Sequence, residues 1–331
     1  MMKYASTQRN PWLHRLAIVT AVSCFLLQFI GGLVTSHQAG LSVPDWPNSY
    51  GWNMFTFPMK NWMGNIFYEH THRLFASYVG FLILVQAGLL QWKDQRPWVK
   101  RLGWLALGGV ILQGILGGLT VLYYLPPAIS SAHAGLAEIV LCLTIAIAMV
   151  TSNRWDVGRV KRPERTRVGV RTLSLVTVLT IFTQLLIGAV MRHTFSGLAI
   201  PTFPFAPNGN VIPDFTSFGV AINFTHRVGA CCVALMMFLT ARTIFRYHSR
   251  DKVLSIAATF SMFLLGLQIM LGAITIWTAK AVTPTTFHVT CGAAILGTMT
   301  FIMIIARHRL SPVQTQTESS SNQRNVAVSN A

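Results

Sequence analysis

Long apolar segments alternate with shorter polar ones along this chain. Eight apolar segments can be distinguished, at 13–36, 70–91, 102–123, 132–151, 172–191, 224–243, 253–278 and 285–306. Each reaches the roughly 20 residues that a helix needs to cross the hydrocarbon core of a bilayer. Because hydrocarbon offers the backbone no hydrogen-bonding partner, each of these segments is expected to be a helix. The pattern predicts an all-α integral membrane protein with eight transmembrane helices.

Composition and charge placement support a membrane protein. The chain is 52% hydrophobic and only 11% charged, whereas soluble domains carry about 25% charged residues. If the N-terminus is inside, 21 of the 26 lysines and arginines fall in inner segments, and the outer ones are Lys60, Arg73, Arg192, Arg227 and Lys280. This is the positive-inside bias, with both termini cytoplasmic. The net charge of +17 therefore indicates a protein in membrane lipid, and nucleic-acid binding is not expected.

The N-terminal region and the cysteines indicate the compartment. The first apolar segment is longer than the core of a signal peptide, and only a dozen or so polar residues precede it, too few for a mitochondrial transit peptide. A bacterial plasma membrane is therefore expected. The cysteines all lie within apolar segments, so no structural disulfide is predicted. They are Cys24, Cys142, Cys231, Cys232 and Cys291.

The second half of the chain repeats the first. The corresponding pairs are Gln28–Val34 with Gln184–Val190, Gly40–Pro47 with Gly197–Pro204, Thr71–Arg73 with Thr225–Arg227, Gln113 with Gln268, and His133 with His288. Each half has four helices, so both enter the membrane in the same sense. Such repeats are related by a pseudo-two-fold axis along the membrane normal. We expect two duplicated four-helix bundles, 1–153 and 172–310, joined by a basic cytoplasmic linker, 154–171, and followed by a disordered tail, 311–331.

Four histidines, His72, His133, His226 and His288, each stand near the start of an even-numbered apolar segment. They therefore share one depth, near the outer face, and form one pair in each half. Two imidazoles that face each other across a four-helix bundle can act as axial ligands of haem iron. A helix N-terminus would keep the rings neutral, with a lone pair available for iron. Zinc is a weaker alternative, because the pairs lack acidic or thiolate companions at that depth.

Other residues near the histidines fit the same hypothesis. Arg73 and Arg227 each follow a histidine and are candidates to pair with haem propionates. Glycines on the odd-numbered helices would leave room for a flat ring, although small residues also serve plain helix contact. They are Gly31, Gly32, Gly117, Gly118, Gly188 and Gly272. A lone interfacial histidine usually bonds to a loop, but four in register across a repeat favour the haem interpretation.

The halves differ at one position next to the first histidine. Glu69 lies three residues before His72, on the same helical face, and its counterpart is Asn223. This difference predicts unequal roles for the two sites. His70 maps to Phe224 and cannot face the same pocket as His72, so it is not expected to bind iron. The role of Glu138, whose counterpart is Ala293, is left open.

With Glu-x-x-His-Arg at Glu69–Arg73, the Gly-Leu-Ser-x-Pro-Asp-Trp loop and four repeat-related histidines, the chain resembles the haem A synthase family from about residue 16 to 306. Members oxidise the C8 methyl group of haem O to a formyl group and so make haem A for cytochrome oxidase. The resemblance implies that His226 and His288 bind a haem b cofactor. It also implies that His72 and His133 bind the substrate, haem O, with Glu69 as catalytic carboxylate. Some bacterial members carry a cysteine pair in the first outer loop, whereas residues 37–68 contain none.

The leading hypothesis is an oxidoreductase that acts on a methyl group by two successive hydroxylations. The first alternative is a di-haem b cytochrome that only transfers electrons, for example from quinol. The second is a haem carrier or exporter without chemistry. The difference between Glu69 and Asn223 favours the enzyme. Expected partners, from family context, are the protohaem farnesyltransferase that makes haem O (haem O synthase) and an unidentified electron donor. The direct oxygen source, dioxygen or water, stays open, as do the reaction of a six-coordinate iron and the oligomeric state.

Overall fold

The computed structural model describes residues 10–153, 155, 162–164, 166 and 168–312. These residues contain eight helices that are long and apolar enough to cross a membrane, which confirms the prediction of an all-α integral membrane protein. They are α1 Pro11–Ser36, α2 Asn65–Lys93, α3 Pro97–Leu122, α4 Pro127–Thr151, α5 Val170–His193, α6 Phe218–Tyr247, α7 Lys252–Trp277 and α8 Val282–Arg309. Short 3-10 turns lie in the loops, η1 Met54–Thr56, η2 Met59–Asn61 and η3 Ser196–Leu198.

The even-numbered helices begin before their apolar segments do. For example, α2 begins at Asn65 and α6 at Phe218, five and six residues ahead of the predicted starts. Polar residues continue the helix through the interface, where water can still satisfy the first backbone groups. The paired histidines therefore lie about two turns inside their helices, because a turn takes 3.6 residues. The expectation that they stand at helix N-termini was wrong, and the helix dipole, which acts within the first turn, does not set their charge.

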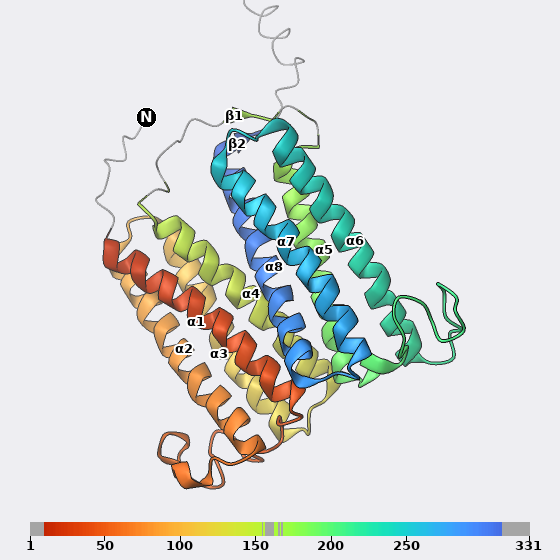
Figure 1. Cartoon of the computed structure of the whole chain (residues 1–331). Helices are drawn as coiled ribbons and strands as arrows, with labels where there is room; N and C mark the ends of the chain where they lie inside the picture. The colour runs from red at the N-terminus through yellow and green to blue at the C-terminus, as the bar shows by residue number, and fades with distance from the viewer. Residues whose placement is uncertain (1–9, 154, 156–161, 165, 167, 313–331) are drawn as a thin grey trace, which may run out of the picture.

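The helices pack in two groups of four that lie side by side (Figure 1). In the first group α1 contacts α2 and α4, while α3 contacts α2 and α4. The second group repeats these contacts, α5 with α6 and α8, and α7 with α6 and α8. The groups meet where α1 and α4 contact α8, and where α4 contacts α5. The contacts thus group the helices in fours, while the duplicated bundles and the axis that relates them stay a prediction.

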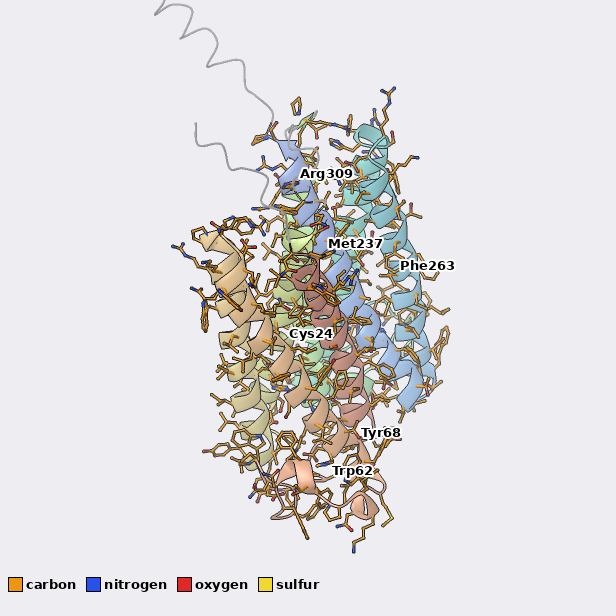
Figure 2. All side chains as sticks on the ribbon, turned by 90° about the vertical axis from the view of Figure 1, so that its left-hand side faces the viewer. Cys24, Trp62, Tyr68, Met237, Phe263 and Arg309 are labelled. Carbon is orange, nitrogen blue, oxygen red and sulfur yellow. The ribbon has the colours of Figure 1, made fainter. Side chains whose placement is uncertain are left out.

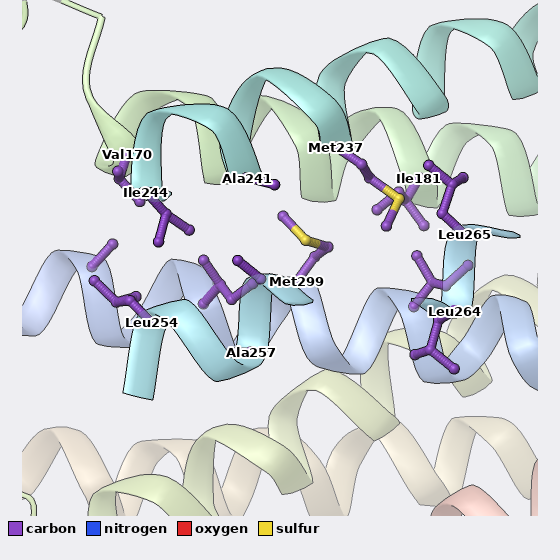
Figure 3. Close-up of a cluster of buried hydrophobic side chains, with 14 of the residues drawn as sticks. Val170, Ile181, Met237, Ala241, Ile244, Leu254, Ala257, Leu264, Leu265 and Met299 are labelled. Carbon is purple, nitrogen blue, oxygen red and sulfur yellow. The ribbon is translucent and has the colours of Figure 1, made fainter. Parts of the chain in front are cut away.

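Each group has its own apolar core. In the second group, Met237 of α6, Leu254 of α7 and Met299 of α8 are among the buried side chains between the helices (Figure 3). In the first group, Ile83, Leu90 and other residues of α1–α4 form the corresponding cluster, which Ala293 of α8 joins. Large apolar side chains such as Phe263 also point outward, where the side chain is 65% exposed (Figure 2). Outward apolar side chains are what a lipid environment requires.

The two ends of the molecule differ in character. Trp62 and Tyr68 lie at the end that carries the long loops, and Arg309 lies at the opposite end (Figure 2). There Arg309 pairs with Asp251 at 2.8 Å. At this end strand β1 (Arg162–Pro163) pairs in parallel with β2 (Leu310–Ser311), so the linker touches the end of α8. Much of the predicted linker (154, 156–161, 165 and 167) and most of the predicted tail (313–331) lie outside the described residues.

Candidate functional site

The histidine pair of the second half comes together between α6 and α8. The ring centroids of His226 and His288 lie 6.5 Å apart, and the ring planes are inclined by 66°. A metal–nitrogen bond to histidine is about 2 Å long, and an imidazole centre lies about 1 Å behind its nitrogen. Two rings on opposite faces of one iron would thus be separated by roughly 6 Å. The observed separation fits a shared metal centre.

Groups on the odd-numbered helices support both rings of this pair. The side-chain amide nitrogen of Gln184 lies 3.0 Å from Nδ1 of His226 and donates to the backbone carbonyl of the same histidine at 2.7 Å. Nδ1 of His288 lies 3.2 Å from the backbone carbonyl oxygen of Gln268. The Gln184 amide holds the His226 ring at Nδ1, whereas Nδ1 of His288 can donate its N–H to the Gln268 carbonyl oxygen, which leaves Nε2 of His288 with a lone pair for a metal. Such support of the second ring nitrogen is typical of metal-binding histidine.

A glycine lies against the ring of each of the four histidines. A Cβ added at Gly188 would come within 3.0 Å of Cε1 of His226, and one at Gly272 within 3.0 Å of Cε1 of His288. A Cβ added at Gly117 would lie 3.1 Å from Cε1 of His133, and one at Gly31 would lie 3.3 Å from Nε2 of His72. The remaining two predicted glycines, Gly32 and Gly118, face Thr286 and Trp46 instead. Four glycines therefore lie against imidazole rings, while the space that they were expected to leave for a flat ring stays a prediction.

The histidine pair of the first half is supported differently. His72 of α2 and His133 of α4 lie close enough for their charges to interact. Gln113 donates to the backbone carbonyl of His133 at 2.9 Å and approaches Nε2 of its ring at 3.4 Å. Gln28, the counterpart of Gln184, lies beside the buried Glu138, and its Nε2 has no hydrogen-bond partner among the described residues. The support that His226 receives from Gln184 is therefore missing at His72.

Glu69 and Arg73 together hold the first outer loop. The buried Glu69 accepts a hydrogen bond from Arg73 Nη2 at 2.5 Å and another from the backbone N–H of Val43 at 2.7 Å. Arg73 also donates to the carbonyl oxygens of Val43 and Asp45, each at 2.6 Å, and of Asn48 at 3.0 Å. Hydrogen bonds thus fix the Glu69 carboxylate one turn before His72.

Asp45 gives this loop a second carboxylate. Partial burial opposes its ionisation, but hydrogen bonds from the backbone N–H groups of Gly51 and Tyr50 lower the pKa of Asp45 below its usual value. Because Asp45 stays charged, it can keep the turn that precedes η1 closed near neutral pH.

Asn223 and Arg227 hold the second outer loop in the corresponding way. Asn223 donates to the carbonyl oxygens of Ser196 and Gly197 at 3.1 and 3.0 Å, and it accepts from Nε of Arg227 at 3.1 Å. Arg227 also donates to loop carbonyl oxygens at positions 200, 202 and 204. The donors of both Arg73 and Arg227 are thus largely taken up by loop acceptors. Their pairing with haem propionates stays a prediction.

Two other outer histidines, His70 of α2 and His37 just after α1, pack between the first outer loop and α2. His70 is buried, with Nδ1 3.1 Å from the Ser49 hydroxyl and its ring beside Trp62 at 4.6 Å. The ring of His37 stacks on that of Tyr68, with the ring centroids 3.8 Å apart. These contacts are those of loop-packing residues. Within the described ranges, no group of three or more histidine, cysteine, aspartate or glutamate residues could hold a metal ion, so the histidines are grouped as pairs.

Sequence analysis missed the roles of Gln113 and Gln184. Both are repeat positions, with Gln268 and Gln28 as counterparts, and each lies one turn before a glycine that faces a histidine. This shared spacing of glutamine and glycine could have marked the glutamines as neighbours of the histidines. It could not show which glutamine side chain reaches a histidine, because Gln28 and Gln184 have the same spacing and different contacts.

The fold and these contacts define a multi-pass helical membrane protein with two histidine pairs near the end that carries its long loops. Residues 14–300 match the family COX15-CtaA, described as "Cytochrome oxidase assembly protein". The chain belongs to this family, which confirms the family to which the sequence motifs pointed.

Individual relatives carry the name "Heme A synthase". A protein of Lysinibacillus sphaericus is 24% identical over 308 residues, which cover 91% of this chain and 97% of that protein. One of Bacillus pumilus is 25% identical over 307 residues, covering 90% of this chain and 96% of the other. One of Listeria welshimeri is 24% identical over 216 residues, 63% of this chain and 68% of that protein. The similarity thus spans nearly all of the transmembrane region.

Proposed function

We propose that this protein is a haem A synthase, an enzyme that oxidises the C8 methyl group of haem O to a formyl group for use in cytochrome oxidase. The observation that carries the proposal is the His226–His288 pair at 6.5 Å, in a chain of the cytochrome oxidase assembly family. The names of its relatives support the same activity. The difference between Glu69 and Asn223, at corresponding positions of the two halves, supports an enzyme over a symmetric electron carrier.

The second half is the cofactor half in this proposal. His226 and His288 would hold the iron of haem b, since their rings have a fitting separation, glycine neighbours and engaged Nδ1 atoms. When bound, haem b supplies one-electron transfer. Gln184 keeps the His226 ring in place, and the Gln268 carbonyl oxygen, by accepting from Nδ1 of His288, keeps Nε2 of His288 available for iron.

The first half is the substrate half, where His72 and His133 would bind the iron of haem O. Each of two hydroxylations converts a C–H bond of the methyl group into C–OH. With water as oxygen source, a hydroxylation releases two electrons and two protons, whereas with dioxygen it consumes two of each and also forms water. The resulting geminal diol loses water and becomes the formyl group. Glu69, held by Arg73 and Val43, would accept a proton or stabilise positive charge at the methyl carbon.

The proposed location is a bacterial plasma membrane, with both termini cytoplasmic. Trp62 of the first outer loop and Tyr68 near the start of α2 lie at the end opposite Arg309 (Figure 2), in keeping with a polar outer end and a basic inner end. Both histidine pairs would then lie near the outer face. Proposed partners are haem O, the farnesyltransferase that makes it, and an electron donor of unidentified chemistry.

The test is production of the full-length protein together with a haem O source in a host that makes no haem A, followed by mass analysis of extracted haems. Appearance of haem A supports the enzyme. If the purified protein carried low-spin haem b while haem O stayed unchanged, the electron-transfer cytochrome would replace the proposal. If haem O accumulated across the membrane without oxidation, the protein would be a carrier.

A further inference from the structure

Arg192 is a cation near the junction of the two halves, in the last turn of α5. Its Nη2 donates to the carbonyl oxygen of Gly32 at 3.2 Å and to the hydroxyl of Ser36 at 3.0 Å, both on α1. Among the described residues, no carboxylate lies within ion-pair distance of Arg192, and its Nε–H and Nη1–H groups have no protein acceptor. A half-buried arginine in a membrane protein normally pairs with an anion or lines a functional site.

Arg192 is placed on the face of α5 that serves the second histidine pair. Gln184, Gly188 and Arg192 are spaced by four residues and therefore share one face of the helix. Gln184 bonds to His226, Gly188 lies against its ring, and Arg192 follows one turn closer to the outer end. The Arg192 charge also lies near enough to His288 to act on it. Arg192 thus lies one helical turn beyond the glycine that contacts the His226 ring, on the outer side of the second histidine pair.

The first half has no equivalent cation. The counterpart of Arg192 is Ser36, whose hydroxyl accepts from Arg192 and from Thr286 of α8 at 2.9 Å. Arg227, the other arginine near the second pair, already donates to four acceptors. Of these two arginines, Arg192 is therefore the one that still has N–H groups to offer to a ligand.

We propose that Arg192 binds a propionate carboxylate of the haem held by His226 and His288. Guanidinium and carboxylate groups form short, charge-assisted hydrogen bonds that can be bidentate. The inference rests on the proposed function, since it assumes a haem in the second half. It adds an anchoring residue that the first half lacks, which suits a resident cofactor in one half and an exchangeable substrate in the other.

The test compares haem with a haem whose carboxylates are blocked. Full-length protein from haem-deficient cells is loaded in detergent with protohaem or with protohaem dimethyl ester. Haem loss to an excess of a soluble haem scavenger is then followed by absorbance. We expect Arg192→Gln to speed the loss of protohaem roughly 10- to 100-fold, as removal of a charge-assisted hydrogen bond should. Arg192→Gln should leave the rate of dimethyl ester loss nearly unchanged. Arg192→Lys should lose protohaem at a rate between those of the wild type and Arg192→Gln.

Ser36→Ala is the matched control, because it removes a hydrogen bond between α5 and α1 and keeps the guanidinium. It should change neither rate by more than about threefold. Equal acceleration of both haems by Arg192→Gln would overturn the proposal and make Arg192 a helix–helix link or the partner of another anion, such as a lipid phosphate. No haem A is made in this assay, so a wrong enzymatic assignment would leave the result intact. A wild-type protein that retained neither haem would overturn the haem site itself.

Discussion

Arg73 donates a hydrogen bond of 2.5 Å to the carboxylate of Glu69, one turn before it in α2, and both side chains are buried. In the second half, Arg227 donates to the amide oxygen of Asn223 at 3.1 Å across the same spacing. The two pairs hold their outer loops alike, but only the first contains a second charged group. That charge, one turn from His72, distinguishes the proposed substrate site from the proposed cofactor site.

Replacing Glu69 by glutamine tests the role of this charge. Glutamine keeps the size and can still accept from Arg73, but it removes the negative charge and the proton acceptor. Haem A formation should fall about 100- to 10,000-fold, the usual contribution of a positioned acid–base group. Haem O or the singly hydroxylated product should accumulate, as measured by mass analysis of extracted haems. Asn223→Gln is the control and should have far less effect. Haem A formation at the unaltered rate in the Glu69 variant would make the carboxylate structural.

Loss of Arg73 should destabilise the protein. Arg73→Ala leaves Glu69 buried without its cation and removes three hydrogen bonds to loop carbonyl oxygens. Breaking one side of a buried ion pair typically costs about 3–5 kcal/mol. We expect a lower unfolding temperature in detergent and faster proteolysis of the loop between α1 and α2. The exposed Lys60, in the same loop, provides the control Lys60→Ala, which should change neither. Equal stability of the two variants would contradict the anchoring role.

Loss of either second-half histidine should remove the bound cofactor. The purified protein is expected to carry low-spin, six-coordinate haem b, because two imidazoles would occupy both axial positions. His226→Ala or His288→Ala leaves a five-coordinate iron and a poorly held ring, so haem per protein should drop and the low-spin absorbance bands disappear. His37→Ala, whose ring only stacks on Tyr68, should retain the spectrum. If both alanine variants kept it, the assignment of this half would fail.

The glycines beside the histidines leave little room for a side chain. At Gly188 an added Cβ would lie 3.0 Å from Cε1 of His226, tighter than most packed contacts, so Gly188→Ala should displace the imidazole slightly. We expect weaker haem retention and altered low-spin bands. Gly266 of α7 has no atom within 4 Å of such a Cβ, so Gly266→Ala should bind haem normally. Normal haem binding by Gly188→Ala would show that the ring position is not critical.

The proposed topology predicts the location of each connection. Reporter fusions in the loops between α1 and α2 and between α5 and α6 should report an outer location. Fusions after Arg309 should report the cytoplasm, where the basic residues are retained. An outer location of the region after α8 would reverse the whole arrangement and move all four histidines to the cytoplasmic side.

The number of long apolar helices followed from the sequence alone. A long apolar segment must satisfy its own backbone in hydrocarbon, so the length and composition of each segment were enough to predict eight helices. The repeat likewise identified His72, His133, His226 and His288 together, because corresponding positions in two similar halves share a depth. The starts of α2 and α6 were missed, since a helix can continue through polar residues at the interface, where hydropathy gives no signal.

Only the tertiary structure decided which side-chain atoms meet. Gln28 and Gln184 occupy corresponding positions, yet Gln184 bonds to His226 while Gln28 lies beside Glu138, a residue replaced by alanine in the other half. Donors of Arg73 go to carbonyl oxygens 25 to 30 residues away in the chain. Arg192, in contrast, keeps N–H groups that have no acceptor in the described part of the chain. A hydrogen-bonding partner depends on the path of loops and on neighbouring helices. Residue type and spacing do not contain that information.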